Sequence, residues 1–286
     1  MSIQTGIGES YRRASWLERF AGAAGRNLTN PRVRRVLGAL FHRALSWLPG
    51  DHLICRLPDG EVLRIDAAHR FIGWNAIEYR ELKASVRPGA HVLDIGANVG
   101  AYTVLLARWA GPQGHVYAFE PAPAARTGLE RHLALNGLSD RVTIVPEAVA
   151  GTSGTASFEA SGFRGDNRLT GVSRPAAGPL AGTIEVRTTT IDEFCGRLGA
   201  APDVIKMDIE GAELMGLQGA RHTIAAAGPS LALFVEFHPT TWPSLGVTRG
   251  QMEEELRRQH LVIEPTAEYA DPWSVEGVCV RLRRES

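Results

Sequence analysis

The chain has 286 residues, 31 basic and 31 acidic side chains, a formal net charge of zero and a hydrophobic content of 44%. This length permits one large α/β domain or two small ones, and the neutral charge argues against a general attraction to nucleic acid. Cys55, Cys195 and Cys279 lie far apart without metal-binding spacing, and no apolar run reaches transmembrane length, so we expect a cytoplasmic protein.

Residues 1–50 are predicted to form a basic helical arm. The segment holds eight arginines against two glutamates, and its apolar residues recur at helical spacing, with breaks near Gly22–Gly25 and Asn30-Pro31. Such an amphipathic arm is a candidate for peripheral membrane attachment or for self-association. We favour docking of its apolar face on the remaining domain, residues 51–286, or on a second subunit, where it helps to cover the substrate site.

Residues 51–88 are predicted to form a β-hairpin and a leading helix. Strands over 52–57 and 61–65 are joined by the turn sequence Pro58-Asp59-Gly60, and a helix from about Trp74 to Val86 stops before Pro88-Gly89. From residue 91 on, strands alternate with helices, which indicates a parallel sheet covered on both faces. We expect strands at 91–95, 115–119, 142–145, 183–190, 204–208 and 231–236, helices at about 99–110, 123–135, 191–198, 211–226 and 249–260, and a last strand at 275–283 that pairs antiparallel at or near an edge.

Residues 151–182 depart from this alternation. They are rich in Gly, Ser, Thr, Ala and Pro, and only residues 156–158 give a strand signal. A loop of this length inside a domain is usually functional or mobile. Its polar side chains are candidates for hydrogen bonds to a polar substrate, although a variable surface insertion fits equally well; these side chains are Arg164, Asp166, Asn167 and Arg168.

The first core strand ends in an acid, Asp94, and runs into a turn with glycines at 96 and 100. Glycine in such a turn lets a nucleotide-like cofactor approach the backbone. A carboxylate here opposes the phosphates of NAD or ATP, whereas it suits the ammonium and sulfonium of S-adenosylmethionine. A second acid, Glu120, ends the next strand, where it can accept hydrogen bonds from both hydroxyls of a ribose. Asp94 alone could be a helix cap, but the two acids together favour S-adenosylmethionine.

Three further acids cluster where a later strand, ending at Asp208, passes into the segment Glu210-Gly211-Ala212-Glu213. Lys206 lies two residues before Asp208 and so on the same face of the strand. A lysine in so apolar a strand needs a carboxylate partner, and Asp208 is the candidate. The next strand closes with Glu236-Phe237-His238. Acids at the ends of four strands, all at one edge of the sheet, indicate a cationic ligand.

These motifs resemble the FkbM-type S-adenosylmethionine-dependent methyltransferases. The matching segments are 92–100, Phe119-Glu120-Pro121, 190–194, 205–213 and 235–238, in an order that agrees over roughly residues 75 to 240. The resemblance implies a Rossmann-like class I methyltransferase fold, with a seven-stranded, mostly parallel sheet and a reversed last strand. It also implies O-methylation of natural products, sugars or glycolipids.

By the same resemblance, Asp94, Gly96, Asn98 and Gly100 surround the methionine part of the cofactor, Glu120 binds its ribose, and Glu147-Ala148 forms the adenine-side turn. The full set of residues that we expect to bind S-adenosylmethionine is Asp94, Gly96, Ala97, Asn98, Gly100, Glu120, Pro121, Glu147, Ala148 and Asp208.

Methyl transfer to a hydroxyl also requires a group that removes or polarises the hydroxyl proton. The candidate catalytic residues are His238, Glu236 and Glu210, with His238 first because an unperturbed imidazole titrates near pH 6.5. The alternative for His238 is a loop residue hydrogen-bonded to backbone. The expected partner is a hydroxyl acceptor: a small molecule, sugar, glycolipid or natural product.

Two alternative functions remain at this point. A metal-assisted O-methyltransferase could draw ligands from Asp208, Glu210, Glu236 and His238, but their spacing is no recognised metal motif, so we assign no metal. A non-catalytic cofactor-binding protein of the same fold is disfavoured by the intact acids at the fourth and fifth strands.

Overall fold

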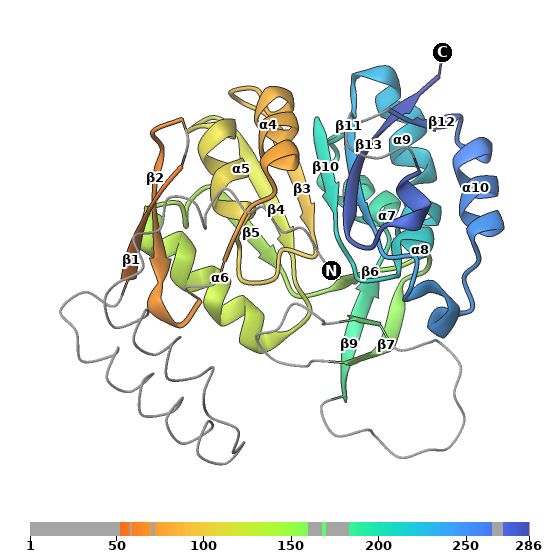
Figure 1. Cartoon of the computed structure of the whole chain (residues 1–286), viewed down its shortest axis with the longest axis horizontal. Helices are drawn as coiled ribbons and strands as arrows, with labels where there is room; N and C mark the ends of the chain where they lie inside the picture. The colour runs from red at the N-terminus through yellow and green to blue at the C-terminus, as the bar shows by residue number, and fades with distance from the viewer. Residues whose placement is uncertain are drawn as a thin grey trace.

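A seven-stranded sheet forms the centre of the computed structural model (Figure 1). Its order is β12-β13-β11-β10-β3-β4-β5, and β13 runs antiparallel to both of its neighbours, whereas β11, β10, β3, β4 and β5 run parallel. The reversed last strand confirms the class I methyltransferase fold expected from the sequence. The strands are β3 His91–Ile95, β4 His115–Phe119, β5 Val142–Val145, β10 Val204–Met207, β11 Ala232–Phe237, β12 Leu261–Ile263 and β13 Val278–Arg284.

The structure describes residues 52–57, 59–69, 72–159, 168–169, 183–264 and 271–285. The predicted arm, residues 1–50, lies outside the described residues, as do Arg164, Asp166 and Asn167 and the side chain of Arg168. No helix in the described ranges is long and apolar enough to cross a membrane.

Helices cover both faces of the sheet, with α4, α5 and α6 on one side and α7 to α10 on the other (Figure 1). Because successive side chains of a strand point to opposite faces, Val92 joins one apolar core and Leu93 joins the other. The helices are α4 Ala76–Ser85, α5 Thr103–Ala110, α6 Pro123–Asn136, α7 Ile191–Leu198, α8 Glu213–Gln218, α9 Arg221–Ala227 and α10 Arg249–Arg258, with short 3-10 turns at Ala67–His69, Gly228–Ser230, Trp242–Leu245 and Pro272–Ser274.

The predicted hairpin is confirmed as β1 His52–Arg56 and β2 Val62–Asp66, which pair antiparallel. A second, four-stranded sheet has the order β6-β9-β7-β8. Its strands are β6 Ala148–Val149, β7 Gly154–Glu159, β8 Arg168–Leu169 and β9 Thr183–Thr189. Strand β7 confirms the strand signal at residues 156–158, whereas the prediction of a loop is wrong for the rest of β7 and for 168–169. Of residues 154–158 only Phe158 is buried, so the apolar alternation reveals only part of the strand.

Two predicted helices have different bounds in the structure. The expected helix over 211–226 is two helices, α8 and α9, because Gly219 comes so close to Ala150 that a Cβ would lie 2.4 Å from its carbonyl oxygen. The start of α9 is capped from α7, where the Asp192 carboxylate accepts the backbone N–H groups of residues 222 and 223. Helix α5 begins at Thr103 rather than at 99, since the preceding turn still contains left-handed backbone at Gly100.

Candidate active site

The turn after β3 contacts the ends of the two neighbouring strands, β4 and β10. Gly96 has φ +83°, and a Cβ there would lie 1.7 Å from the carbonyl oxygen of Asp208 at the end of β10, so only glycine fits. The N–H groups of Gly96 and Ala97 both donate to the carbonyl of Phe119, at 3.0 and 2.9 Å. These two bonds attach the turn to the end of β4.

Glu120 follows β4 and faces this turn. Its carboxylate accepts the backbone N–H of Asn98 at 2.9 Å and that of Ala122 at 2.8 Å, one on each oxygen. Each oxygen therefore keeps a second lone pair for a ligand hydroxyl. Burial raises the pKa of Glu120 to about 7, although the two backbone N–H groups and Arg126 oppose the rise. Glu120 is thus a pre-positioned acceptor whose charge depends on pH near neutrality.

An open pocket beside Glu120, at the carboxyl edge of the sheet, holds about 380 Å³ of empty space when its mouth to the solvent is included. Six of the ten residues expected to bind the cofactor line it: Gly96, Glu120, Pro121, Glu147, Ala148 and Asp208. The other four, Asp94, Ala97, Asn98 and Gly100, are not among its lining residues. The remaining five lining residues were not among those expected to bind the cofactor, and all are apolar: Ile95, Phe119, Val149, Phe158 and Ile209. Phe158 belongs to β7, and an isolated aromatic between polar residues was the available signal.

Asp94 is buried beneath this pocket in a charged network. Its Oδ2 accepts the Thr103 hydroxyl at 2.6 Å, while its buried Oδ1 has no hydrogen-bond partner among the described residues. Lys206 stands opposite Asp94 in the register of β10 and β3. Burial, the largest influence, raises the pKa of Asp94, and Lys206 opposes the rise. The unpaired oxygen is a buried acceptor suited to a cationic ligand.

The ammonium of Lys206 binds carboxylates from two directions. Its Nζ lies 3.6 Å from Asp208 Oδ2, which confirms the expected partner, and 3.8 Å from Glu78 Oε1 on α4, which the sequence did not indicate. It also sits 4.9 Å from the centre of the Tyr102 ring. Burial lowers the pKa of Lys206, but Asp208, Glu78 and Asp94 together raise it above its usual value. Lys206 is therefore a fixed internal cation.

His238, just after β11, is held by a buried carboxylate. Its Nδ1 donates to Glu213 Oε1 at 2.9 Å, so its side-chain partner is an acid and not backbone. Glu213 is fully buried and also accepts the N–H of Gly211 at 2.7 Å and the indole N–H of Trp242 at 2.8 Å. This arrangement fixes both the orientation and the tautomer of the imidazole.

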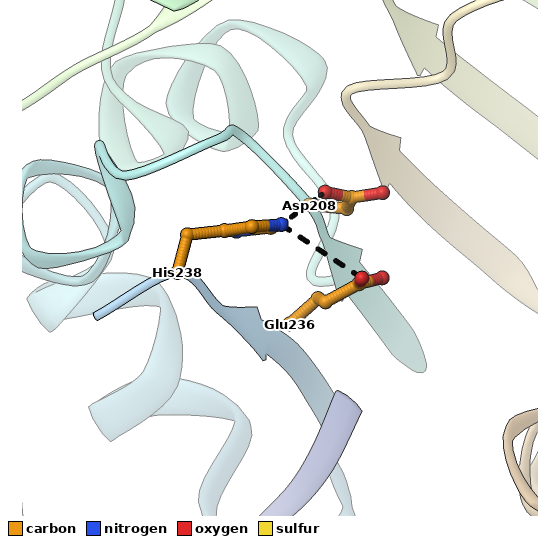
Figure 2. Close-up of side chains that lie close together, drawn as sticks. All are labelled: Asp208, Glu236 and His238. Carbon is orange, nitrogen blue, oxygen red and sulfur yellow. Dashed lines mark ion pairs between the residues drawn. The ribbon is translucent and has the colours of Figure 1, made fainter. Parts of the chain in front are cut away.

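The other imidazole nitrogen faces the remaining predicted catalytic residues. His238 Nε2 lies 3.5 Å from Glu210 Oε2 and 3.8 Å from Glu236 Oε1. It also lies 3.8 Å from Asp208 Oδ1 (Figure 2). The structure thus brings together His238, Glu236 and Glu210, and Asp208 connects this cluster to the pocket that it lines.

The charge state of His238 differs from the sequence expectation. Burial lowers its pKa, but hydrogen bonding to Glu213 and the charges of Asp208, Glu213 and Glu210 raise it to about 10. The imidazole therefore holds a proton at neutral pH when no ligand cation is present. Burial, followed by Asp208 and Glu78, raises the pKa of Glu236 well above its usual value. A value near 6.5 fails because it ignores carboxylates that only the fold brings together.

The sheet with its reversed strand, the glycine turn after β3 and the Glu120 carboxylate in the wall of the pocket define a class I methyltransferase site for S-adenosylmethionine. The family model described as the methyltransferase FkbM domain matches residues 94–261, more than half of the chain. The chain belongs to this family and is an S-adenosylmethionine-dependent methyltransferase.

Individual relatives are more distant. A protein-L-isoaspartate O-methyltransferase of Hyperthermus butylicus is 33% identical over 122 residues, which cover 40% of this chain and 45% of that protein, so the match spans less than half of the relative's length. A solved structure of an FkbM methyltransferase from Methylobacillus flagellatus is 19% identical, with a TM-score of 0.44 and coverage of 72% of this chain and 50% of that one. Fibrillarin of Aeropyrum pernix, solved with bound S-adenosyl-L-methionine, is 13% identical, with a TM-score of 0.44 and coverage of 81% and 94%.

Proposed function

We propose that the enzyme transfers the methyl group of S-adenosylmethionine to a hydroxyl of a small molecule, sugar, glycolipid or natural product. The observation that carries the proposal is the position of the His238 cluster. Asp208 contributes to the wall of the cofactor pocket and also lies 3.8 Å from His238 Nε2. A hydroxyl must lose its proton during methyl transfer, and this cluster supplies proton-accepting groups beside the pocket.

The residues around the pocket fit the cofactor. Glu120 would hold the two ribose hydroxyls through the lone pairs that its backbone bonds leave. Asp94 offers a buried, unpaired oxygen, and Gly96 keeps the turn clear of a side chain. When bound, the cofactor supplies an electrophilic methyl group on a positively charged sulfur. The chain must hold the acceptor hydroxyl in line with that group at about 3–3.5 Å.

His238, Glu236 and Glu210 are the candidates for receiving the hydroxyl proton. His238 remains the first of them because Glu213 fixes its Nδ1 and leaves Nε2 directed at the cluster. With a pKa of about 10, the imidazole can act as a base only after a nearby positive charge has lowered that value. Binding of a cation in this acid-rich edge is therefore part of the proposal.

The experiment uses a cofactor labelled with ¹³C in its methyl group and a panel of small molecules extracted from the host. The carbon chemical shift and mass of the product separate an O-methyl group from an N- or C-methyl group. His238→Ala should leave cofactor affinity nearly unchanged and reduce turnover by about 10²–10⁴-fold. His222→Ala, which alters an exposed histidine on α9, is the matched control. A labelled methyl group on nitrogen or carbon would contradict O-methylation, and normal turnover by His238→Ala would remove His238 from the mechanism.

A further inference from the structure

We propose that Asp208, Glu236 and His238 bind a divalent metal ion at the carboxyl edge of the sheet, with Mn²⁺ or Zn²⁺ as the best chemical match. The inference deepens the proposed function and rests on it for the role of the ion in catalysis. Binding of the ion itself can be tested without any acceptor substrate.

The three side chains converge from neighbouring strands. Asp208 follows β10, Glu236 lies within β11 and His238 follows β11, and one ligand atom from each comes within 4.8 Å of the other two (Figure 2). His238 Nε2 is 3.8 Å from both Asp208 Oδ1 and Glu236 Oε1. A point equidistant from three such atoms lies roughly 2–2.5 Å from each, close to usual metal–ligand bond lengths. The side chains therefore need little movement to coordinate one ion.

One of the ligand atoms is buried without a hydrogen-bond partner. Asp208 Oδ1 is buried and has no such partner in the described part of the chain. His238 is only 5% exposed, and its Nε2 faces the carboxylates of Asp208, Glu210 and Glu236 at 3.5–3.8 Å. Buried polar atoms are normally paired, and an ion bound between Nε2 and Oδ1 would give Oδ1 a partner.

The histidine is also prepared in the way that metal ligands usually are. Its Nδ1 donates to Glu213, which orients the ring and makes Nε2 the free coordinating nitrogen. Glu213 is itself held by the N–H of Gly211 and the indole of Trp242. On the other side, Lys206 Nζ lies 3.6 Å from Asp208 Oδ2, which leaves Oδ1 directed at the cluster. His238 and Asp208 are thus each oriented by a second residue, Glu213 and Lys206 respectively.

The ligand set selects the class of ion. Two carboxylate oxygens suit Mg²⁺, Ca²⁺ and Mn²⁺, whereas an imidazole nitrogen favours Zn²⁺ and other transition ions. Mn²⁺ and Zn²⁺ accept both ligand types. Positive charge in this cluster comes from Lys206 and, in the ion-free protein, from the protonated His238, beside carboxyl groups on Glu78, Asp94, Asp208, Glu210 and Glu236. A divalent ion would take the place of the imidazole proton among these acids.

A bound ion would assign separate roles in catalysis to the residues of the cluster. A metal-bound hydroxyl loses its proton more readily, so the ion would activate the acceptor. With the ion bound, His238 would be a ligand through Nε2 and could no longer receive the hydroxyl proton. Glu210, whose Oε2 lies 3.5 Å from Nε2, would replace it as the proton acceptor. The O–H bond breaks, the oxygen bonds to the methyl carbon, and the electron pair of the carbon–sulfur bond stays on sulfur. No oxidant or reductant is required.

The test uses the purified full chain after treatment with EDTA, with Mn²⁺ alone as the probe. Electron paramagnetic resonance of free Mn²⁺ during a titration gives the number of ions bound and the dissociation constant. We expect one ion per chain at micromolar concentration, and at least tenfold weaker binding by Glu236→Gln and Asp208→Asn. Glu254→Gln, which alters a half-exposed acid on α10, is the matched control and should bind like the wild type.

A thermal unfolding scan keeps the test decisive if a variant folds poorly. Mn²⁺ and Zn²⁺ should raise the melting temperature of the wild type, since an ion that binds only the folded state stabilises it. Absence of binding by the wild type, or binding that Glu236→Gln leaves unchanged, would overturn the metal site. Metal binding together with a methyl group found on nitrogen or carbon would support the site and contradict the proposed O-methylation alone.

Discussion

The affinity for the cofactor should depend on pH through the ionisation of Glu120. The carboxylate must be ionised to accept hydrogen bonds from both ribose hydroxyls with full strength, and burial raises its pKa to about 7 in the ligand-free protein. A carboxyl group with a raised pKa becomes neutral as the pH falls through that value. Affinity for the cofactor is therefore expected to be complete above pH 8 and to weaken steadily below pH 7.

The size of the effect follows from that pKa. If only the ionised form binds well, the dissociation constant rises roughly tenfold between pH 8 and pH 6, which corresponds to about 1.4 kcal/mol. Glu120→Gln removes the titrating group and should bind about tenfold or more weakly at pH 8, because charge-assisted hydrogen bonds are worth about 1.5–3 kcal/mol each.

Isothermal titration calorimetry with S-adenosylhomocysteine at pH 6, 7 and 8 measures both quantities. Titration of the ligand's own amino group affects the wild type and Glu120→Gln alike, so the difference between the two proteins isolates Glu120. Parallel pH profiles for the two proteins would refute the assignment of Glu120 as the ribose acceptor.

Three further predictions concern the supporting structure. Gly96→Ala should abolish cofactor binding and lower the melting temperature in a thermal scan, because its Cβ would lie 1.7 Å from a backbone oxygen. The control Gly89→Ala, at a residue with φ +88° and open space around it, should cost only about 1–2 kcal/mol of backbone strain, and equal effects of the two variants would contradict the close approach at Gly96. Lys206→Met should reduce the free energy of unfolding in urea by about 3–5 kcal/mol, because the buried carboxylates around it lose their cation. The control Lys83→Met, which removes a partly exposed ion pair, should cost at most about 1 kcal/mol, and an equally small effect of Lys206→Met would show that the buried carboxyl groups are neutral. If the arm, residues 1–50, docks on the protein itself, the full chain should stay in the supernatant when anionic vesicles are sedimented. Strong, salt-sensitive co-sedimentation with the vesicles would favour a membrane role for the arm instead.

The sequence predicted the structure best where a functional residue lies next to a local pattern that also determines the fold, such as the end of an apolar strand. Acids at Asp94, Glu120 and Asp208 stand at the ends of apolar strands, so alternation of strands and helices is enough to bring them to one edge. The reversed strand β13 was predictable for the same reason, because its apolar pattern survives at the end of the chain. The C-cap of α6 was equally local: Gly137 takes the left-handed conformation expected after Asn136.

What the sequence did not reveal depends on partners distant in the chain. Glu78 reaches Lys206 only because α4 packs on one face of the sheet, and no spacing rule links the two residues. The protonation of His238 at neutral pH follows from the combined charges of several carboxylates and from the buried Glu213. Strand β7 has a single buried apolar side chain among residues 154–158, so its sequence indicates a strand only at 156–158, and pairing with β9 extends it over 154–159.

A crystal structure of the full chain with S-adenosylhomocysteine tests most directly whether the pocket and the His238 cluster are two halves of one active site. We predict that the ribose hydroxyls bind the Glu120 carboxylate. We also predict that the sulfur, which marks the position of the transferred methyl group, points toward Asp208, Glu236 and His238. A sulfur that points away from this cluster, or a ribose bound elsewhere, would contradict a single active site.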